Sequence, residues 1–437
     1  MKNKLLLFVV FTVIIHSKYL YSQDFIAMSI ADNPKSLFTN PALSLNQKKF
    51  FNLPLVGSLN AKVSNNFSFT DIADKTKDDD YRLNTNELLK YLSESNNFFT
   101  SKYSMDFLHW GRSIGENDYL GLSFRHRFSG AGSLPHGLAE LLFDNPYNKY
   151  KTFDIASTFR FVMWNEIGAS YSHKLDENWR IGGRVKYLSG MQNVETEKLS
   201  YTVEKLPDYY LLSSDVNIKS TNTNYYSSNT RFTLIDNPGI GIDIGAKYQS
   251  TDKRFTANAS ISDLGIIYWS NSINTITKKP NSKFRFDGFG DLDEIGAFDL
   301  IKLFDSIGTD FKDTIGLKTM KNYSYSSAIP MTFQASGTYS IDKNFSHNVN
   351  LGFAWTSITS EKLHYAVSAG YYWLSKSKNW QLLANYTYYG NSASGIGLGA
   401  AYNTKGYQVY AAIDNISSSL NSRLLGFDIG ICFFDLF

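Results

Sequence analysis

Hydrophobic and polar residues alternate along the second half of the chain with a period of two. From residue 331 to residue 341, Met331, Phe333, Tyr339 and other apolar residues share one face, and polar residues occupy the other. This alternation predicts a strand with one apolar and one polar face. Six later segments follow the same template, at residues 346–356, 363–373, 380–389, 394–403, 406–414 and 425–434. Such a succession predicts an antiparallel meander.

The first half of the chain follows the same rule less strictly. Arg125 and Arg127 share one face of a segment whose other face carries Leu120, Leu122 and Phe124. Seven candidate strands lie at residues 50–66, 99–111, 118–130, 161–174, 178–190, 239–249 and 254–263. The two halves together predict about 14 strands, an even number as in single-chain outer-membrane barrels.

The links between the candidate strands separate into two classes that alternate. Tight links lie at residues 112–117, 175–177, 250–253, 342–344, 374–378 and 404–405, and long ones at 67–98, 131–160, 191–238 and 264–329. Short periplasmic turns that alternate with longer extracellular loops are typical of outer-membrane barrels. The prediction is therefore an all-β fold, an antiparallel transmembrane β-barrel of about 14 strands. A soluble β-sandwich, which also buries alternate residues, is the alternative.

Composition agrees with a barrel. The chain has 437 residues, of which 19% are charged and 16% aromatic, and its mean hydropathy is −0.26. It is too polar for a bundle of membrane helices, each of which needs about 20 consecutive apolar residues. One cysteine excludes a disulfide framework and a cysteine-based metal site. With 43 basic and 40 acidic residues, nucleic acid is not expected as a partner.

Residues 1–22 have the layout of a secretory signal peptide. Lys2 and Lys4 precede an apolar run over residues 5–15, and Ser22 before Gln23 is a plausible cleavage point. A retained membrane anchor is the alternative, although the run is too short to span a membrane. Residues 1–22 are therefore assigned to a signal peptide, 23–49 to an N-terminal periplasmic or luminal hatch, and 50–437 to the barrel. The expected location is the outer membrane of a Gram-negative cell.

The chain ends on an aromatic residue that continues an apolar strand face. Phe437, Phe433, Ile431 and Ile429 share the same parity. This ending resembles the terminal-strand signal by which outer-membrane barrels are recognised for assembly, and Asp435, on the same parity, departs from it. The resemblance implies the barrel assembly machinery as a partner, besides membrane lipid and lipopolysaccharide.

The tripeptide Asn40-Pro41-Ala42 lies between the mature N-terminus and the first strand. Asn-Pro favours a turn, and Ala permits close backbone approach. Here the chain resembles FadL-type fatty-acid transporters and their 14-stranded relatives, including the PorV-type barrel of type IX secretion, which have such a tripeptide in a hatch ahead of strand one. It also resembles a family of uncharacterised barrels of Bacteroidota-type bacteria. An ordinary turn before a strand is the alternative for these three residues.

Charged residues lie on the faces predicted to point into the lumen. A buried charge must be paired or hydrated. These charges therefore either line a polar passage or bind an anionic headgroup, or they pair across strands to fill the lumen. The candidate cluster consists of Asp106, Arg125, Arg127, Glu166, Arg180, Arg184, Lys186 and Asp243.

The long links predict helical insertions but no chemistry. Helices are expected at residues 85–93, at 137–143 and after Asp291. The acids Asp287, Asp291, Asp293 and Glu294 lack the spacing of a calcium loop, so no metal is predicted. No catalytic motif is present; His364 with Ser368 is the best candidate pair, and Cys432 is interpreted as inward-facing filler. Neither an enzyme nor a cofactor is expected.

The FadL resemblance implies a passive channel for small hydrophobic or amphiphilic molecules. The PorV resemblance implies the alternative, a barrel without transport that docks or shuttles a partner in secretion or envelope assembly. A structural barrel with a plugged lumen is a third reading. Apolar lumen residues that form a continuous pocket would favour the channel, and a charge-filled lumen would favour the others.

Overall fold

We analysed a computed structural model of the chain. The structure describes residues 25, 29–52, 58–64, 73–75, 81–84, 87, 90, 98–133, 135–142, 150–221, 236–270, 273–277, 283–286, 318–321, 324–357, 363–389, 393–416 and 424–435. The predicted signal peptide, the predicted helix after Asp291 with its neighbouring acids, Phe437 and most of the predicted helix 85–93 lie outside these residues.

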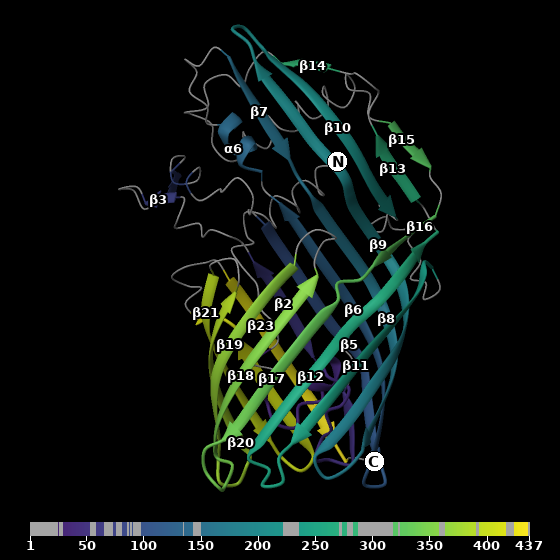
Figure 1. Cartoon of the computed structure of the whole chain (residues 1–437), viewed down its shortest axis with the longest axis vertical. Coiled ribbons are helices and arrows are strands. Elements are labelled where there is room, and N and C mark those ends of the chain that lie inside the picture. Colours follow the sequence, from purple (N-terminus) through teal and green to yellow (C-terminus); the bar gives the residue numbers. More distant parts are fainter. Residues whose placement is uncertain are drawn as a thin grey trace.

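The described residues form a closed antiparallel barrel of 14 strands, as the alternation predicted (Figure 1). Each strand pairs with the next one along the chain. The first position is shared by β1 and β2, which both pair with β5 and with β23, so the sheet closes on itself. The strands are β1 (Lys49–Asn52) with β2 (Leu59–Ser64), β5 (Phe98–Ile114), β6 (Asp118–Ser133), β8 (Phe159–Lys174), β9 (Trp179–Lys205), β11 (Pro238–Gln249), β12 (Phe255–Trp269), β16 (Tyr325–Ala328) with β17 (Thr332–Ser340), β18 (His347–Ser357), β19 (Leu363–Leu374), β20 (Trp380–Tyr389), β21 (Ala393–Asn403), β22 (Tyr407–Ile413) and β23 (Leu424–Phe434).

Tight turns connect the strands at one end of the barrel, the lower end in Figure 1. All six links that the sequence predicts to be tight join neighbouring strands there. In the turn between β11 and β12, the Ser250 hydroxyl donates a 2.5 Å hydrogen bond to the Asp252 carboxylate. Together with the backbone N–H of Arg254, this bond holds the pKa of that carboxyl below its usual value.

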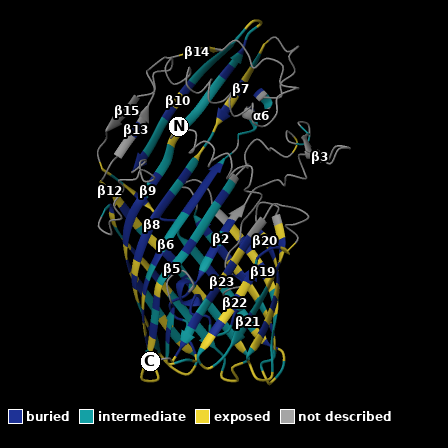
Figure 2. Cartoon of the chain, turned by 180° about the vertical axis from the view of Figure 1, so that it is seen from behind, coloured by how far each residue is buried: buried dark blue, intermediate teal, exposed yellow. Residues whose placement is uncertain are grey.

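The outer wall of the barrel is an apolar belt between two rings of aromatic residues. Outward side chains such as Leu351, Ile242 and Leu382 are exposed, because alternation turns every second residue away from the lumen. Figure 2 shows exposed residues around the barrel wall and the turns. The exposed aromatics near the turns include Trp179, Phe255, Tyr339, Trp380 and Tyr407, and those farther up include Tyr268, Tyr365 and Tyr388.

One side of the barrel rises into a tall sheet (Figure 1). Strand β9 has 27 residues, which at about 3.4 Å per residue corresponds to roughly 90 Å. Its upper part pairs with β7 (Lys151–Ala156) on one side and β10 (Tyr210–Thr221) on the other. Strands β13 (Ile273–Thr277) and β14 (Lys283–Phe286) pair with β10, and β15 (Lys318–Lys321) pairs with β13. The sequence predicted a loop over residues 191–238, so much of that prediction was wrong.

Helices contribute little to the described structure. Helix α6 (His136–Leu142) falls within one residue of the predicted 137–143, and α3 (Ser36–Thr39) is a single turn. Strands β3 (Ala73–Lys75) and β4 (Tyr81–Leu83) form a separate hairpin. Among the described residues, no helix is both long and apolar enough to cross a membrane.

Buried apolar clusters lie inside the barrel. Near the turns, Leu37 and Leu45 from the N-terminal segment pack on Phe50, Tyr119 and Phe434. Higher up, Trp164, Leu188, Ile267 and Trp269 form a second cluster with neighbouring residues. Among the described residues, these clusters fill part of the lumen.

Candidate functional site

The N-terminal segment before β1 lies inside the barrel, and we call its residues 29–48 the hatch. Gln381 of β20 accepts the N–H of Ala31 through Oε1 (2.8 Å) and donates from Nε2 to the carbonyl of Ser29 (2.7 Å). Gln408 of β22 donates to the carbonyl of Ala31 (2.8 Å). Buried side-chain amides on the barrel wall thus satisfy the backbone of the hatch, as burial requires.

The predicted tripeptide Asn40-Pro41-Ala42 is buried against the opposite wall. Asn40 accepts the N–H of Ala42 through Oδ1 (2.9 Å) and donates from Nδ2 to the carbonyl of Ala246 (3.1 Å). Two glycines make room for it. A Cβ at Gly182 would lie 2.4 Å from the Pro41 carbonyl oxygen, and one at Gly245 would lie 2.0 Å from Asn40 Oδ1.

Phe38, in the single turn α3, is the aromatic anchor of the hatch. Its ring stacks on the His109 ring with centroids 4.1 Å apart. The guanidinium carbons of Arg125 and Arg184 lie 3.8 Å and 4.9 Å from the centroid of the Phe38 ring. Arg184 also donates to the Phe38 carbonyl (3.1 Å). Cation–π and stacking contacts therefore join the hatch to charged residues of β6 and β9.

Most of the predicted lumen charges form one continuous network of ion pairs. Arg125 Nε lies 2.9 Å from Asp106 Oδ1, and its NH1 lies 3.1 Å from Glu166 Oε1. The other oxygen of Glu166 lies 3.0 Å from NH1 of Arg127. These residues come from β5, β6 and β8, so the register of three neighbouring strands brings them together.

A second group continues the network across β9, β11 and β12. Lys186 Nζ lies 2.7 Å from Asp243 Oδ1 and 2.6 Å from Asp263 Oδ1. Arg127 donates two hydrogen bonds, of 2.6 Å and 2.9 Å, to the Asp263 carboxylate. Arg184 Nε donates a hydrogen bond to Asp243 (2.5 Å). Four cations thus face four carboxylates, and this pairing compensates the cost of burying them.

Two residues distinguish the structure from the sequence prediction. Arg180 lies outside the network and donates to the Ser172 hydroxyl (3.2 Å) instead. Asp263, the last residue of the candidate strand 254–263, belongs to the network but was not predicted, because a bulge shifts the register of β12 there. It lies at a bulge in β12 with a φ of 64°, and β12 continues to Trp269. A single charged residue within a strand that otherwise carries no charge is the signal that would have identified it.

Two further ion pairs involve the hatch and β2, which is a neighbour of β5 in the barrel wall. Lys35 pairs with Asp428 of β23, and Lys62 of β2 pairs with Asp414 at 3.2 Å. Tyr410 donates to Asp428 at 3.2 Å. Lys35 is therefore a charged anchor of the hatch, as Phe38 is an aromatic one.

Cavities lie against the hatch on two sides. The first, of about 100 Å³, is lined by hatch residues Lys35, Phe38 and Thr39 and by charged wall residues. The second, of about 140 Å³, is lined by Ile30, Asn40 and neutral amides and hydroxyls such as Asn350. Gln334, which donates to the Thr39 carbonyl (2.6 Å), borders both cavities. The hatch therefore separates a cationic space from a neutral one.

The remaining candidate residues make structural contacts where the structure describes them. Ser368 accepts hydrogen bonds from Asn385 and Thr387, and the His364 side chain lies outside the described residues. Cys432 is buried beside Phe434, facing inward as predicted. No group of three potential metal ligands occurs in the described part of the chain. Phe433, Ile431 and Ile429 lie on the outer face of β23.

Comparison with known proteins gives a family and distant structural similarity. The model of a family of unknown function (DUF5723) matches residues 41–414. No curated protein matches the chain. The solved structures that resemble it include a Pseudomonas aeruginosa FadL homologue (11% identity, 92% of each chain covered, TM-score 0.40), the Ralstonia pickettii toluene transporter TbuX (9% identity, 94% of this chain and 98% of that one, TM-score 0.33) and the Pseudomonas putida toluene transporter TodX (8% identity, 96% and 95%, TM-score 0.33). These TM-scores are low, so the fold and the site rest on the chain's own contacts.

Proposed function

Because the chain belongs to a family of unknown function (DUF5723), we propose its function from its own geometry. We propose that it is an outer-membrane barrel that passively conducts small hydrophobic or amphiphilic molecules past a movable hatch. The supporting observation is that the hatch, held by hydrogen bonds, ion pairs and ring contacts, separates two lumen cavities. A gate in a passive channel must separate two spaces and must be held by non-covalent contacts that can be broken. The hatch meets both conditions.

The outer surface supports the location. An apolar belt bounded by aromatic rings is the surface that outer-membrane barrels present to lipid. On β20, outward aromatics Trp380 and Tyr388 are eight residues apart, about 27 Å along the strand. With a tilt of about 40°, that corresponds to roughly 20 Å along the barrel axis, close to the height of such a belt. Removal of residues 1–22, insertion by the barrel assembly machinery and contact with lipopolysaccharide belong to this proposal.

The chemistry of the lumen favours amphiphilic over purely hydrophobic solutes. In the described residues the apolar cluster around Trp164 and Trp269 is buried, and Trp164 borders the first cavity. The first cavity is lined mainly by charged and hydroxyl-bearing residues. A solute on this route therefore meets polar groups first, which a polar headgroup satisfies.

Docking of a partner without transport, as in PorV-type barrels, is the second candidate function. The observation that favours it is the tall sheet of β7, β9 and β10, which extends beyond the barrel (Figure 1). Such a sheet offers a surface on which a partner protein can dock. The ion-paired network, which fills one side of the lumen, also fits a barrel that does not conduct.

Dye entry into intact cells tests the proposal. N-phenyl-1-naphthylamine is a small hydrophobic dye that fluoresces once it has crossed the outer membrane. We expect replacement of Asn40-Pro41-Ala42 by Gly-Ser-Gly to accelerate dye entry several-fold over the parent barrel, because the turn against Gly182 and Gly245 is lost. Mass spectrometry of the purified barrel should also identify bound amphiphiles. Entry equal to that of cells without the barrel, together with co-purifying envelope proteins, would favour docking instead.

A further inference from the structure

Four exposed lysines lie on three neighbouring turns at the tight-turn end of the barrel. Lys343 lies between β17 and β18, Lys376 and Lys378 lie between β19 and β20, and Lys405 lies between β21 and β22. Because β18 pairs with β19 and β20 pairs with β21, the three turns follow one another around the rim (Figure 1). We call these four residues the lysine arc.

The charge of the lysine arc is not neutralised within these turns. None of its members forms an ion pair with a carboxylate among the described residues. Asp342 is the one acid in the three turns, and its carboxylate accepts the backbone N–H of His347 (2.7 Å). Backbone N–H groups hold the pKa of that carboxyl below its usual value, so its charge is already stabilised within the turn. With four lysines and one aspartate, the three turns carry a net charge of +3.

The turns between β5 and β6 and between β8 and β9 carry the opposite charge. Their residues, 115–117 and 175–178, include Glu116, Asp176 and Glu177 and no basic residue. The charges of the rim are therefore separated into a positive part and a negative part. Such a separation directs the attraction for anions to one edge of the barrel.

Exposed aromatic side chains lie on the outer wall next to the lysine arc. Trp380 follows Lys378 by two residues, Tyr407 follows Lys405 by two residues, and both aromatics are exposed. The ring of Tyr402 lies between them, with its centroid 4.7 Å from that of Trp380 and 6.3 Å from that of Tyr407. Trp and Tyr on a membrane barrel mark the level of the lipid headgroups. The lysine arc therefore lies at the level of the headgroup phosphates.

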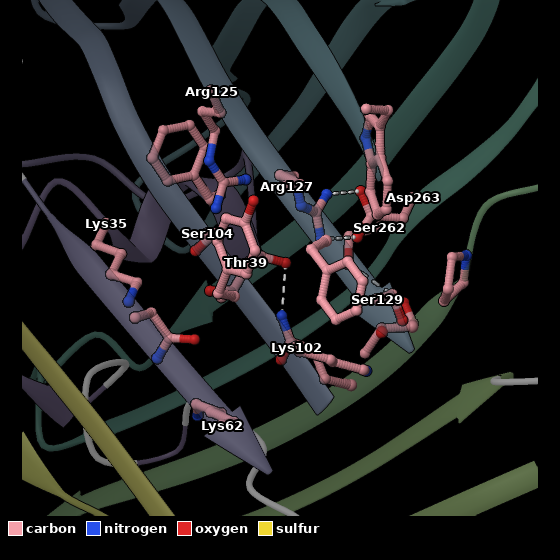
Figure 3. Close-up of a pocket in the computed structure, with 18 residues that line it drawn as sticks. Lys35, Thr39, Lys62, Lys102, Ser104, Arg125, Arg127, Ser129, Ser262 and Asp263 are labelled. Atoms are coloured by element: carbon pink, nitrogen blue, oxygen red, sulfur yellow. Dashed lines mark hydrogen bonds and ion pairs between the residues drawn. The ribbon is translucent and has the colours of Figure 1, made fainter. Parts of the chain in front are cut away.

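Cations inside the lumen are arranged differently. Arg127 pairs with Asp263 at 2.6 Å (Figure 3). Lys186 lies 2.6 Å from Asp263 and 2.7 Å from Asp243. The chain thus supplies acids for these buried cations, whereas it leaves the lysine arc to a partner outside the chain.

We propose that the lysine arc binds the phosphate groups of anionic phospholipids in the leaflet on the tight-turn side of the membrane. Lysine is a donor to phosphate oxygens, and clusters of four or more basic residues beside a membrane-spanning segment attract anionic lipids. Neighbouring hairpins lie about 10 Å apart, so the arc extends over about 20 Å of the rim, which suits a row of headgroups. The adjoining aromatics favour lipid over an acidic protein, because they face lipid themselves. The inference rests on the membrane location in the proposed function and is independent of transport.

Native mass spectrometry of the purified full-length barrel tests the proposal. The barrel is released from micelles that contain equal amounts of phosphatidylglycerol and phosphatidylcholine with identical acyl chains, and the retained lipids are counted by mass. We expect the parent to retain phosphatidylglycerol about tenfold over phosphatidylcholine, and Lys376→Gln/Lys378→Gln to lower that ratio at least about threefold.

The matched control also removes two basic residues. Arg112→Gln/Lys174→Gln changes residues that flank the acidic turns and should leave the lipid ratio unchanged. All four substitutions lie at or near turns, outside the buried lumen networks, so the barrel is expected to fold in both variants.

A preference for phosphatidylglycerol that the arc variant loses and the control keeps supports the proposal. It is overturned if the parent shows no preference, or if the two double variants retain the same ratio. Binding of a decaglutamate peptide that depends on Lys376 and Lys378, without any lipid preference, would overturn it in favour of an acidic protein. A barrel that retains both lipids equally contradicts this inference alone, whereas one that retains neither lipid also contradicts the membrane location.

Discussion

Phe38 joins the hatch to the charged side of the lumen. Its ring lies between the His109 imidazole and the guanidinium groups of Arg125 and Arg184, and its carbonyl accepts from Arg184. One aromatic residue thereby uses stacking, cation–π and hydrogen-bond contacts at once. Under the proposed function, loss of these contacts would make the hatch open more often.

Phe38→Leu should loosen the hatch without unfolding the barrel. Leucine keeps most of the apolar volume but loses the stacking and cation–π contacts, each worth about 0.5–1.5 kcal/mol. We expect limited proteolysis to cleave within residues 29–48 faster, about tenfold if both contacts are lost. Phe255→Leu, on the exposed outer wall, serves as the control. Equal cleavage rates for the two variants would show that Phe38 does not hold the hatch.

Glu166 is the carboxylate that joins both arginines of β6. Replacement by Gln leaves Arg125 and Arg127 buried with one partner fewer, and breaking a buried pair costs about 3–5 kcal/mol. Glu166→Gln should therefore lower the free energy of unfolding by about that amount in denaturant titrations. Glu177→Gln removes an exposed pair with Lys174 and should change it by less than about 1 kcal/mol. A Glu166→Gln variant whose free energy of unfolding is nearly unchanged would contradict a cooperative ion-pair network.

At the scale of the elements, local sequence predicts strands only where they face two different environments. Strands such as β18 and β20 alternate between an apolar outer face and a polar lumen, and the predicted bounds agree with the structure to within about one residue. The upper part of β9, residues 191–205, stands above the apolar belt and carries polar residues on both faces. Its strand conformation depends on pairing with β7 and β10, so its sequence shows no period-two alternation that would predict a strand.

In the candidate site, too, local alternation predicts some residues, whereas others depend on the tertiary structure. Alternation placed Arg125, Arg184 and Asp243 in the lumen, because parity is a local property. It missed Asp263, because a bulge shifts the register of β12 against β11. Several contacts of the hatch join residues more than 200 positions apart, such as Asn40 and Ala246, and no local pattern contains them.

Gly182 and Gly183, adjacent in β9, offer a matched test of the seat of the hatch. A Cβ at Gly182 would lie 2.4 Å from the Pro41 carbonyl oxygen, whereas at Gly183 the nearest atom is 3.7 Å away. Because the clash is with backbone, Gly182→Ala should displace the hatch at a cost of about 1–3 kcal/mol. Proteolytic cleavage of the hatch should then accelerate for Gly182→Ala and stay unchanged for Gly183→Ala. The opposite order would place the hatch elsewhere in solution.

For the whole molecule, the barrel, hatch and tall sheet have separable roles. The barrel supplies an apolar outer wall and a lumen with one charged and one neutral side. The hatch contacts both sides through Lys35, Phe38 and Asn40. Its position therefore depends on the register of strands on both sides of the barrel, and under the proposed function its release would change the lumen without breaking any strand pairing.

A disulfide lock tests the central claim, that movement of the hatch opens the lumen. In a Cys432→Ala background, Asn40→Cys and Gly245→Cys face each other across the hatch contact, where a Cβ at Gly245 lies 2.9 Å from Asn40 Cγ. We predict that dye entry into cells falls to the barrel-free level under oxidising conditions and recovers on reduction, and that each single cysteine variant is insensitive to redox conditions. Equal dye entry through the oxidised and reduced barrel would contradict a gating hatch.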